Sequence, residues 1–228
     1  MAERGLFITF EGMEGSGKST QARRLFDSLD LAGFPVILSR EPGGTPIGEA
    51  VREILINPEY KEMDPLTETF LFAAARRQHV QQVILPQLER GGIVICDRFF
   101  DATTAYQAFG HEIPLQDVED INAMCAWGVK PDVTVYLDID TERGLQRVRR
   151  RYAANGGALD RLERLGPDFF ERVAEGYEYA IANGGERFVL VNGDRDEDSV
   201  SESVMEAVHP HLLARYPKQC VSLEMLGM

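Results

Sequence analysis

The run Gly12-Met-Glu-Gly-Ser-Gly-Lys-Ser19 fits the pattern G-x-x-x-x-G-K-[ST]. The residues before it, 6–11, form an apolar run typical of a buried strand. The residues after it, 20–31, place apolar side chains at helical spacing on one side: Ala22, Leu25, Phe26 and Leu29. Because a strand, a glycine-rich turn and a helix follow one another here, the pattern predicts a phosphate-binding loop rather than an empty turn.

The composition of this loop suits the phosphates of a nucleoside triphosphate. Glycines let backbone N–H groups turn inward, and the helix N-terminus adds roughly half a positive charge. We expect Lys18 to reach the β- and γ-phosphate oxygens and the Ser19 hydroxyl to hold Mg²⁺. The residues expected to bind ATP are Gly12, Met13, Glu14, Gly15, Ser16, Gly17, Lys18, Ser19 and Thr20.

Strand-like and helical runs alternate along the rest of the chain. Further strands are predicted at 34–39, 93–96, 133–137 and 188–191, and helices at 47–56, 66–89, 101–109, 115–126, from 141, 168–183 and 197–213, with no signal after Pro217. Strands joined by crossover helices form a parallel sheet with helices on both faces, and ligands gather at the carboxyl ends of its strands. We therefore predict an α/β fold, a three-layer sandwich of the P-loop NTPase type with a five-stranded parallel sheet and a lid segment.

The composition favours one domain over residues 1–228. The formal net charge of −13 disfavours binding to nucleic acid or to an anionic membrane. No apolar run approaches the roughly 20 residues needed to span a membrane, and the N-terminus leads directly into the first strand, so we expect no signal peptide. The cysteines, at 96, 125 and 220, lack metal-ligand spacing, and we interpret them as thiols in a reducing cytoplasm.

Two acidic residues follow predicted strands and compete for a place beside the metal. Asp97 ends the run 93–96, and Asp138 ends the run 133–137. We favour Asp97, because Arg98 follows it and would place a phosphate-binding guanidinium at the same strand end. For Asp138 we favour a turn or helix-capping role before Thr141.

So acidic a chain needs a local basic site to hold an anionic substrate. Arginines crowd one short segment: Arg143, Arg147, Arg149, Arg150, Arg151, Arg161 and Arg164. The middle of this segment, 152–158, holds two glycines and no apolar periodicity, and we predict a mobile loop there. Two interpretations stay open: a solvated helix surface with a loop, or a lid at about 149–164 that closes over the phosphates and excludes water.

The predicted helix 66–89 carries an aromatic ring and a guanidinium on one face. Phe72 and Arg76 are one helical turn apart, so they lie side by side. Such a pair suits a planar base, because the ring can stack on it and the guanidinium can hydrogen-bond its edge. Taken alone, a phenylalanine at such a position more often belongs to the core.

These features resemble the thymidylate kinase family over nearly the whole chain, from Phe7 to about Val191. The phosphate-binding loop is shared by many NTPases, whereas Arg40-Glu-Pro-Gly-Gly-Thr45 beside Asp97-Arg98 and Ala105-Tyr-Gln107 is far more specific. Further matching stretches are Leu71-Phe-Ala-Ala-Ala-Arg76 with Gln78, Pro131-Asp132, Tyr136-Leu-Asp138 and Asp160-Arg-Leu-Glu163. The sequence departs from the family pattern at Ala75, Phe99, Ala102 and Ala108, which bears on fine contacts at the base edge.

The resemblance implies a dTMP site between about residues 40 and 110. Phe72 would stack on thymine, Arg76 would hydrogen-bond its carbonyl, and Arg98 would grip the acceptor phosphate. Thr103 and Gln107 would meet the base edge.

Other residues would surround the sugar and the transferred group. Arg40 would approach dTMP, Tyr106 would crowd the sugar C2′ position and disfavour ribonucleotides, and Glu14 would lie near the sugar. Gly15 lacks the arginine that one branch of the family has there, so the chain resembles the branch that uses lid arginines. The candidates implied for catalysis are Arg149, Arg150 and Arg151, beside Lys18 and Arg98, with Arg147 on ATP.

The expected activity is transfer of a phosphoryl group from ATP to dTMP with Mg²⁺, on the route to dTTP. No general base is expected, because the acceptor phosphate is already mostly anionic near neutral pH. Another P-loop kinase, acting on a different nucleoside monophosphate or small molecule, is the alternative. A GTPase switch would need an Asn-Lys-x-Asp element, which the sequence lacks. The resemblance further implies a homodimer.

Overall fold

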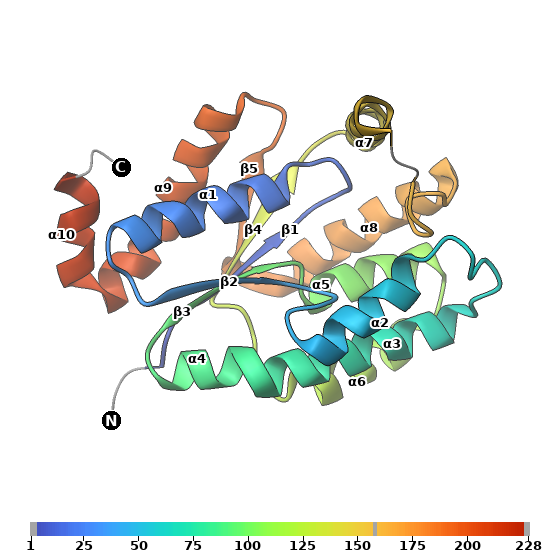
Figure 1. Cartoon of the computed structure of the whole chain (residues 1–228), viewed down its shortest axis with the longest axis horizontal. Coiled ribbons are helices and arrows are strands. Elements are labelled where there is room, and N and C mark those ends of the chain that lie inside the picture. Colours follow the sequence, from blue (N-terminus) through green and yellow to red (C-terminus); the bar gives the residue numbers. More distant parts are fainter. Residues whose placement is uncertain (1–3, 157–158, 226–228) are drawn as a thin grey trace.

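Five parallel strands form the central sheet of the computed structural model, which describes residues 4–156 and 159–225. Their order is β2-β3-β1-β4-β5, so the first strand lies in the middle (Figure 1). The strands are β1 Phe7–Glu11, β2 Val36–Arg40, β3 Ile93–Asp97, β4 Val133–Asp138 and β5 Phe188–Asn192. The predicted five-stranded parallel sheet is confirmed.

β1 is buried along its whole length, because strands flank it on both sides and helices cover both faces. Ile8 lies opposite Ile95 of β3 and Val133 of β4. Ile8 points into one helical layer, whereas Phe7 packs in the core on the opposite face. A strand covered on both faces needs a continuous apolar run, and the sequence before the loop has that character.

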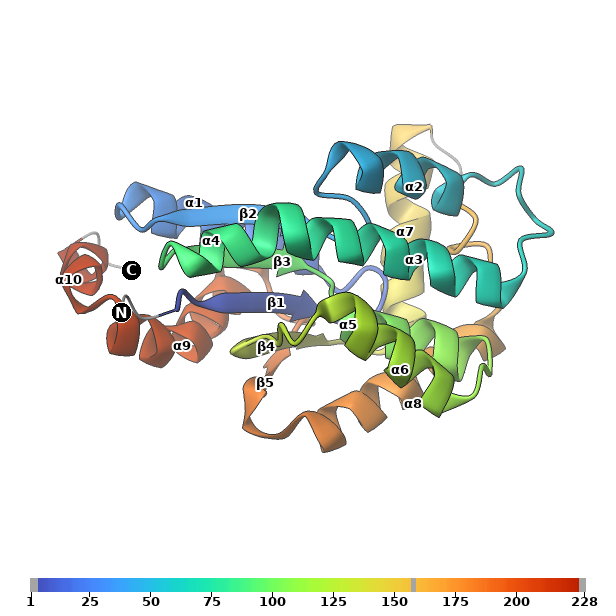
Figure 2. The same cartoon turned by 90° about the horizontal axis from the view of Figure 1, so that it is seen from below.

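Helices enclose the sheet on both faces. One layer contains α1 (Lys18–Leu31), α9 (Glu197–Arg215) and α10 (Pro217–Met225); in Figure 1 α1 lies above the sheet and α10 lies at the far left. The opposite face is covered by α4 (Leu85–Glu89), α5 (Phe100–Thr103), α6 (Leu115–Ala126) and α8 (Pro167–Gly184). The remaining α-helices, α2 (Pro46–Ile56), α3 (Pro65–His79) and α7 (Thr141–Asn155), extend past the end of the sheet toward which β1 points (Figure 2).

Two predicted helices contain π-helical segments. The predicted helix 66–89 is α3 and α4 joined by the π segment Val80–Ile84. Pro86 lies just beyond this segment, and a proline lacks the N–H that a regular α-helix needs, so a wider turn accommodates it. The segment Thr104–Gly110, also π-helical, replaces the later part of the predicted helix 101–109. The tail after Pro217, which carried no signal, forms α10.

The carboxyl ends of the strands meet at one edge of the sheet. In Figure 2 the arrow of β1 points toward α2, α3 and α7, which surround this edge. Ligands of open parallel α/β sheets bind at such an edge. Among the residues described, no helix is both long and apolar enough to cross a membrane.

Candidate active site

The loop between β1 and α1 forms the predicted phosphate cradle. α1 begins at Lys18 rather than at Thr20, and Gly17 caps it at a φ of 94°, a conformation that favours glycine. The Lys18 ammonium turns back over the loop and donates to the Met13 carbonyl oxygen at 3.2 Å. Burial lowers the pKa of Lys18, Arg98 adds to this effect, and Glu14 opposes it.

Gly15 of this loop touches the backbone of α7 directly. Its φ is 75°, and a Cβ there would collide with the carbonyl oxygen of Gly144. A Cβ on Gly144 would collide in turn with the carbonyl oxygen of Glu14. These two glycines let α7 pack against the phosphate loop, and for the same reason an arginine does not fit at position 15.

Ser19 and Asp97 come together at the predicted metal position. The Ser19 hydroxyl donates a short hydrogen bond to Asp97 Oδ2, and Asp97 Oδ1 is buried with no hydrogen-bond partner among the described residues. A spare carboxylate oxygen beside a hydroxyl suits Mg²⁺, a hard cation that prefers oxygen ligands. Asp138 lies exposed at the end of β4. Of the two roles predicted for it, turn or helix cap, the capping role is wrong, because Asp140 caps α7 by accepting from the Arg143 N–H at 2.9 Å.

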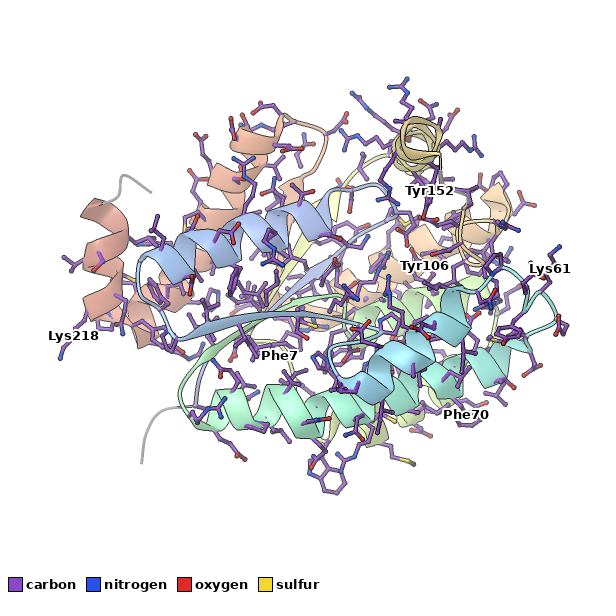
Figure 3. The ribbon with its side chains drawn as sticks, in the orientation of Figure 1. Phe7, Lys61, Phe70, Tyr106, Tyr152 and Lys218 are labelled. Atoms are coloured by element: carbon purple, nitrogen blue, oxygen red, sulfur yellow. The ribbon has the colours of Figure 1, made fainter. Side chains whose placement is uncertain are left out.

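A cleft of about 780 Å³ runs from this metal position toward α3. Among the predicted residues that line it are Lys18, Ser19, Phe72, Arg76, Asp97, Arg98, Thr103, Tyr106 and Gln107. Tyr106 and Tyr152, which both line the cleft, lie below α7 in Figure 3. A second groove, of about 430 Å³, lies on the other side of the loop and is lined by Ser16, Gly17, Thr20, Arg147 and Arg195 among others. The phosphate loop therefore separates two spaces, each large enough for part of a nucleotide.

Arg98 is held in the cleft by three hydrogen bonds. Nη1 donates to the Tyr177 hydroxyl at 2.8 Å, and Nη2 donates to Glu14 Oε1 at 2.6 Å and to the Tyr106 hydroxyl at 3.1 Å. Its backbone φ of 71° lies in the left-handed region, which residues other than glycine rarely occupy. Such strain persists where surrounding contacts over-determine the conformation. Burial disfavours the charge, but Tyr106, Tyr177 and Glu14 raise the pKa of Arg98 well above its ordinary value.

The Glu14 carboxylate joins the phosphate loop to Arg98 in the cleft. Its Oε2 lies 3.7 Å from Lys18 Nζ, and its Oε1 accepts from Arg98. Burial raises the pKa of Glu14, but Lys18, Arg98 and the Tyr106 hydroxyl outweigh burial and lower it to about 2. An ionised carboxylate therefore stands between the two cations expected to contact phosphates.

Arg76 lies deeper than its helical spacing suggests. Its side chain is 2 % exposed, and Nε donates to Glu41 Oε2 at 2.7 Å. The two Nη atoms donate to Asn122 Oδ1 and Thr103 Oγ1, both at 2.9 Å. Glu41 also contacts His79 Nδ1 at 3.0 Å. Sequence reasoning missed these partners. The one available signal was helical spacing, since His79 follows Arg76 by one turn.

Other predicted acceptor residues reach the same cleft in different environments. Gln107 is buried and donates to Glu68 Oε1 at 2.8 Å. Phe72 is half-buried. Arg40, at the end of β2, is 52 % exposed and donates to Glu49 at 2.8 Å. The structure thus brings the predicted base-contacting residues together, although part of their hydrogen-bonding capacity is used by protein partners.

The candidate lid arginines of α7 point in different directions. Arg151 lines both the cleft and the second groove, and it pairs with Glu163 at 3.1 Å. Arg150 lines a separate surface groove on α7, and Arg149 is exposed. Arg147 donates to the Gly193 carbonyl oxygen at 3.0 Å, beside the second groove.

The predicted mobile loop 152–158 is wrong in its first part. Residues 152–155 form the last turn of α7, and Gly156 ends the helix at a φ of 66°. Alanines at 153 and 154 are strong helix formers although they add no apolar periodicity, so the helix continues through them. Residues 157 and 158 lie outside the described residues. Arg161 is buried and donates to the Leu55 carbonyl oxygen at 2.8 Å and to Glu68 at 2.5 Å, so it fastens this segment to α2 and α3.

Comparisons with known proteins agree with this geometry. The thymidylate kinase family model matches residues 10–204. The thymidylate kinase of Roseiflexus castenholzii is 45 % identical over 91 % of this chain and 94 % of its own, and that of Pelotomaculum thermopropionicum is 44 % identical over 90 % and 93 %. A crystal structure of thymidylate kinase from Ehrlichia chaffeensis has 33 % identity and a TM-score of 0.70, covering 90 % of this chain and 99 % of its own. The chain therefore belongs to the thymidylate kinase family and is an ATP-dependent nucleoside monophosphate kinase.

Proposed function

We propose that the enzyme transfers the γ-phosphoryl group of ATP to dTMP. The bond from the γ-phosphorus to the bridging oxygen breaks, a bond to a phosphate oxygen of dTMP forms, and ADP and dTDP leave. One observation carries the proposal: a single cleft connects Lys18 and Asp97 with Arg98 and Phe72. A site of this shape suits two nucleotides whose phosphates face each other.

Mg²⁺ is the metal we infer, held by Ser19 and Asp97. When bound with ATP, the ion neutralises charge on the β- and γ-phosphates. Lys18 and Arg98 flank Glu14 and would bring cations to the donor and the acceptor phosphate respectively. Catalysis then rests on positioning and charge stabilisation, because the acceptor phosphate is already anionic.

We infer that thymine stacks on Phe72 and accepts a hydrogen bond from Arg76. The bonds of Arg76 to Glu41 and Thr103 support this role, because they fix the guanidinium before the base arrives. The hydroxyl of Tyr106 hydrogen-bonds with Arg98 and Glu14, which supports the proposal that its ring crowds the sugar C2′ position. Thymine differs from uracil by one methyl group, worth about 1–3 kcal/mol, so dUMP is expected to be a weak acceptor.

Arg151 is the lid arginine we assign to the transferred phosphoryl group. Of the three candidates, it lies at the junction of the cleft and the second groove. Arg147 contacts the Gly15 carbonyl oxygen at 3.5 Å and borders the second groove, which we assign to the base and ribose of ATP.

A homodimer is the assembly we propose. The neighbouring helices α3 and α6 carry exposed apolar side chains, including Phe70 at 55 % and Met124 at 72 % exposed, with Trp127 after α6 at 62 %. Exposed apolar surface of this kind marks protein interfaces. Light scattering tests this proposal: Phe70→Glu should yield monomers, whereas Leu31→Glu, on α1, should leave the oligomer unchanged. We also infer a cytoplasmic location, which suits the thiols of Cys96 and Cys125.

A panel of acceptors tests the proposed function. Purified enzyme is given ATP and Mg²⁺ with dTMP, dUMP, dCMP, dGMP or AMP, and ADP release is followed by a coupled assay. We expect the order dTMP, then dUMP, then the others, and loss of turnover when EDTA removes Mg²⁺. Preference for any other acceptor would refute the assignment to dTMP.

A further inference from the structure

We propose that Glu11 is a positioning residue that holds Arg98 in its phosphate-facing conformation. The inference rests on the proposed role of Arg98 at the acceptor phosphate. Glu11 ends β1 directly before the phosphate loop, and its side chain is 0 % exposed. A carboxyl group buried so deeply is costly unless its partners compensate. The two groups that donate to Glu11, the Phe99 N–H and the Tyr177 hydroxyl, also fix the conformation of Arg98.

The first tether runs through the backbone. Glu11 Oε1 accepts from the Phe99 N–H at 2.7 Å, and the Arg98 N–H donates to the Phe10 carbonyl oxygen at 3.0 Å. Both peptide groups that flank the Arg98 Cα are therefore bonded to the end of β1. These two hydrogen bonds fix the peptide groups on either side of the Arg98 Cα, where the backbone φ is 71°. The carboxylate thus supports a backbone conformation that would otherwise relax.

The second tether runs through a hydroxyl group. Glu11 Oε2 accepts from the Tyr177 hydroxyl at 2.9 Å, and this hydroxyl accepts from Arg98 Nη1 at 2.8 Å. Tyr177 is 0 % exposed, and its ring packs against the rings of Tyr106 and Tyr136 at centroid distances of 6.4 and 5.3 Å. The hydroxyl is therefore fixed in place and transmits the position of the carboxylate to the guanidinium.

The first tether fixes the backbone of Arg98, and the second fixes its guanidinium group. Glu14 and Tyr106 contact the guanidinium from the cleft, where a substrate would meet it, whereas Glu11 and Tyr177 support it from the interior. Burial and Asp101 raise the pKa of Glu11 to about 7, although Arg98 opposes them. Arg98 is thus a nearby cation that favours the ionised form of this buried carboxyl.

The Tyr177→Phe variant breaks the second tether and keeps the ring. We expect the KM for dTMP to rise roughly tenfold, because the support of a charged group is lost, with the KM for ATP unchanged. Tyr179→Phe is the matched control on α8, since its hydroxyl donates to Glu119 at 3.1 Å on a different side of the helix. An unchanged dTMP KM in Tyr177→Phe would overturn the positioning role.

A double-mutant cycle separates positioning from general stability. In an Arg98→Ala background, Tyr177→Phe and Glu11→Gln should no longer change the dTMP KM, since they act through Arg98. Effects that multiply independently would overturn the inference. Arg98→Ala alone tests the acceptor assignment itself: an unchanged dTMP KM would refute the proposed function. A raised KM in Arg98→Ala with none in Tyr177→Phe would refute the positioning role only.

Discussion

Arginines on the proposed acceptor side of the cleft and arginines on α7 are held in opposite ways. The acceptor wall, which we define as Arg76, Arg98 and their hydrogen-bond partners, keeps its guanidinium groups mostly out of water, with 2 % and 14 % of those side chains exposed. On α7 the Arg151 side chain is 56 % exposed, and Arg149 and Arg150 are exposed as well. The guanidinium groups of the wall already have protein partners in place of water, whereas the cations of α7 remain hydrated.

We expect this difference to separate acceptor binding from turnover. Charges of the wall act in a low dielectric and need little reorganisation when a nucleotide arrives. An exposed ion pair such as Arg151–Glu163 contributes little by itself, and it gains strength only when water is excluded. Changes in the wall should therefore alter acceptor binding and stability, and changes on α7 should alter turnover alone.

Lys18 lines the same cleft as Arg76, Arg98 and Arg151, and its removal should have the largest effect and set the scale for the comparison. Lys18→Ala is expected to lower kcat on the order of 10²–10⁴-fold, because the developing charge on the γ-phosphate loses its nearest side-chain cation. The fold should persist, since Glu14 keeps Arg98 as a partner. A coupled ADP assay measures turnover, and circular dichroism checks the fold. Near-normal turnover would show that Lys18 does not take part in phosphoryl transfer.

A break in the wall should weaken both stability and acceptor binding. Arg76→Ala leaves Glu41 buried without its main cation, and breaking a buried pair costs roughly 3–5 kcal/mol of unfolding free energy. The dTMP KM should rise and the ATP KM should stay constant, as urea unfolding and steady-state kinetics can show. Arg77→Ala is the control, because this neighbour stacks on Trp127 at 4.2 Å. If both KM values rose together, Arg76 would not contact the base.

A change on α7 should show the opposite signature. Arg151→Ala is expected to lower kcat about 10²-fold, as loss of one charge-stabilising donor does, while unfolding free energy stays within about 1 kcal/mol. Arg149→Ala, on the same helix, should leave kcat nearly unchanged. Equal losses of kcat in the two variants would mean that the orientation of Arg151 toward the cleft does not matter.

Local patterns predicted the sheet and the phosphate loop. The glycine spacing of residues 12–19 and the apolar runs depend on neighbours in sequence. The strands and the loop predicted from them therefore agree closely with the structure. The neighbouring Arg98 favours Asp97 at the metal position, and the structure places Asp97 beside Ser19. The identities of the acceptor residues came mainly from the family resemblance, with the spacing of Phe72 and Arg76 in support.

Long-range contacts account for what the sequence analysis missed. The partners of Arg76 come from the turn after β2, from α5 and from α6, and no periodicity links segments so far apart. Arg161 looked like one more basic lid residue, yet Glu68 neutralises it in the interior. The sequence indicates only that Glu11 ends a strand. The fold shows that the Phe99 N–H and the Tyr177 hydroxyl both donate to its carboxyl group.

The pH dependence of stability offers a finer test of how costly it is to bury Glu11, which supports the wall from behind through Tyr177 and Phe99. Burial, with Asp101, raises the pKa of Glu11 from 4.5 to about 7. A carboxyl whose pKa is raised by folding binds its proton more tightly in the native state, so the free energy of unfolding falls as pH rises from about 4.5 to about 7. Glu11→Gln cannot titrate, and the difference between wild type and variant should drop by about 1–2 kcal/mol between about pH 5 and about pH 6.5. Urea unfolding across this range measures the difference, which also cancels the titration of Asp160 and other shared groups. A constant difference would mean that Glu11 is ionised throughout, with the cations near it outweighing its burial.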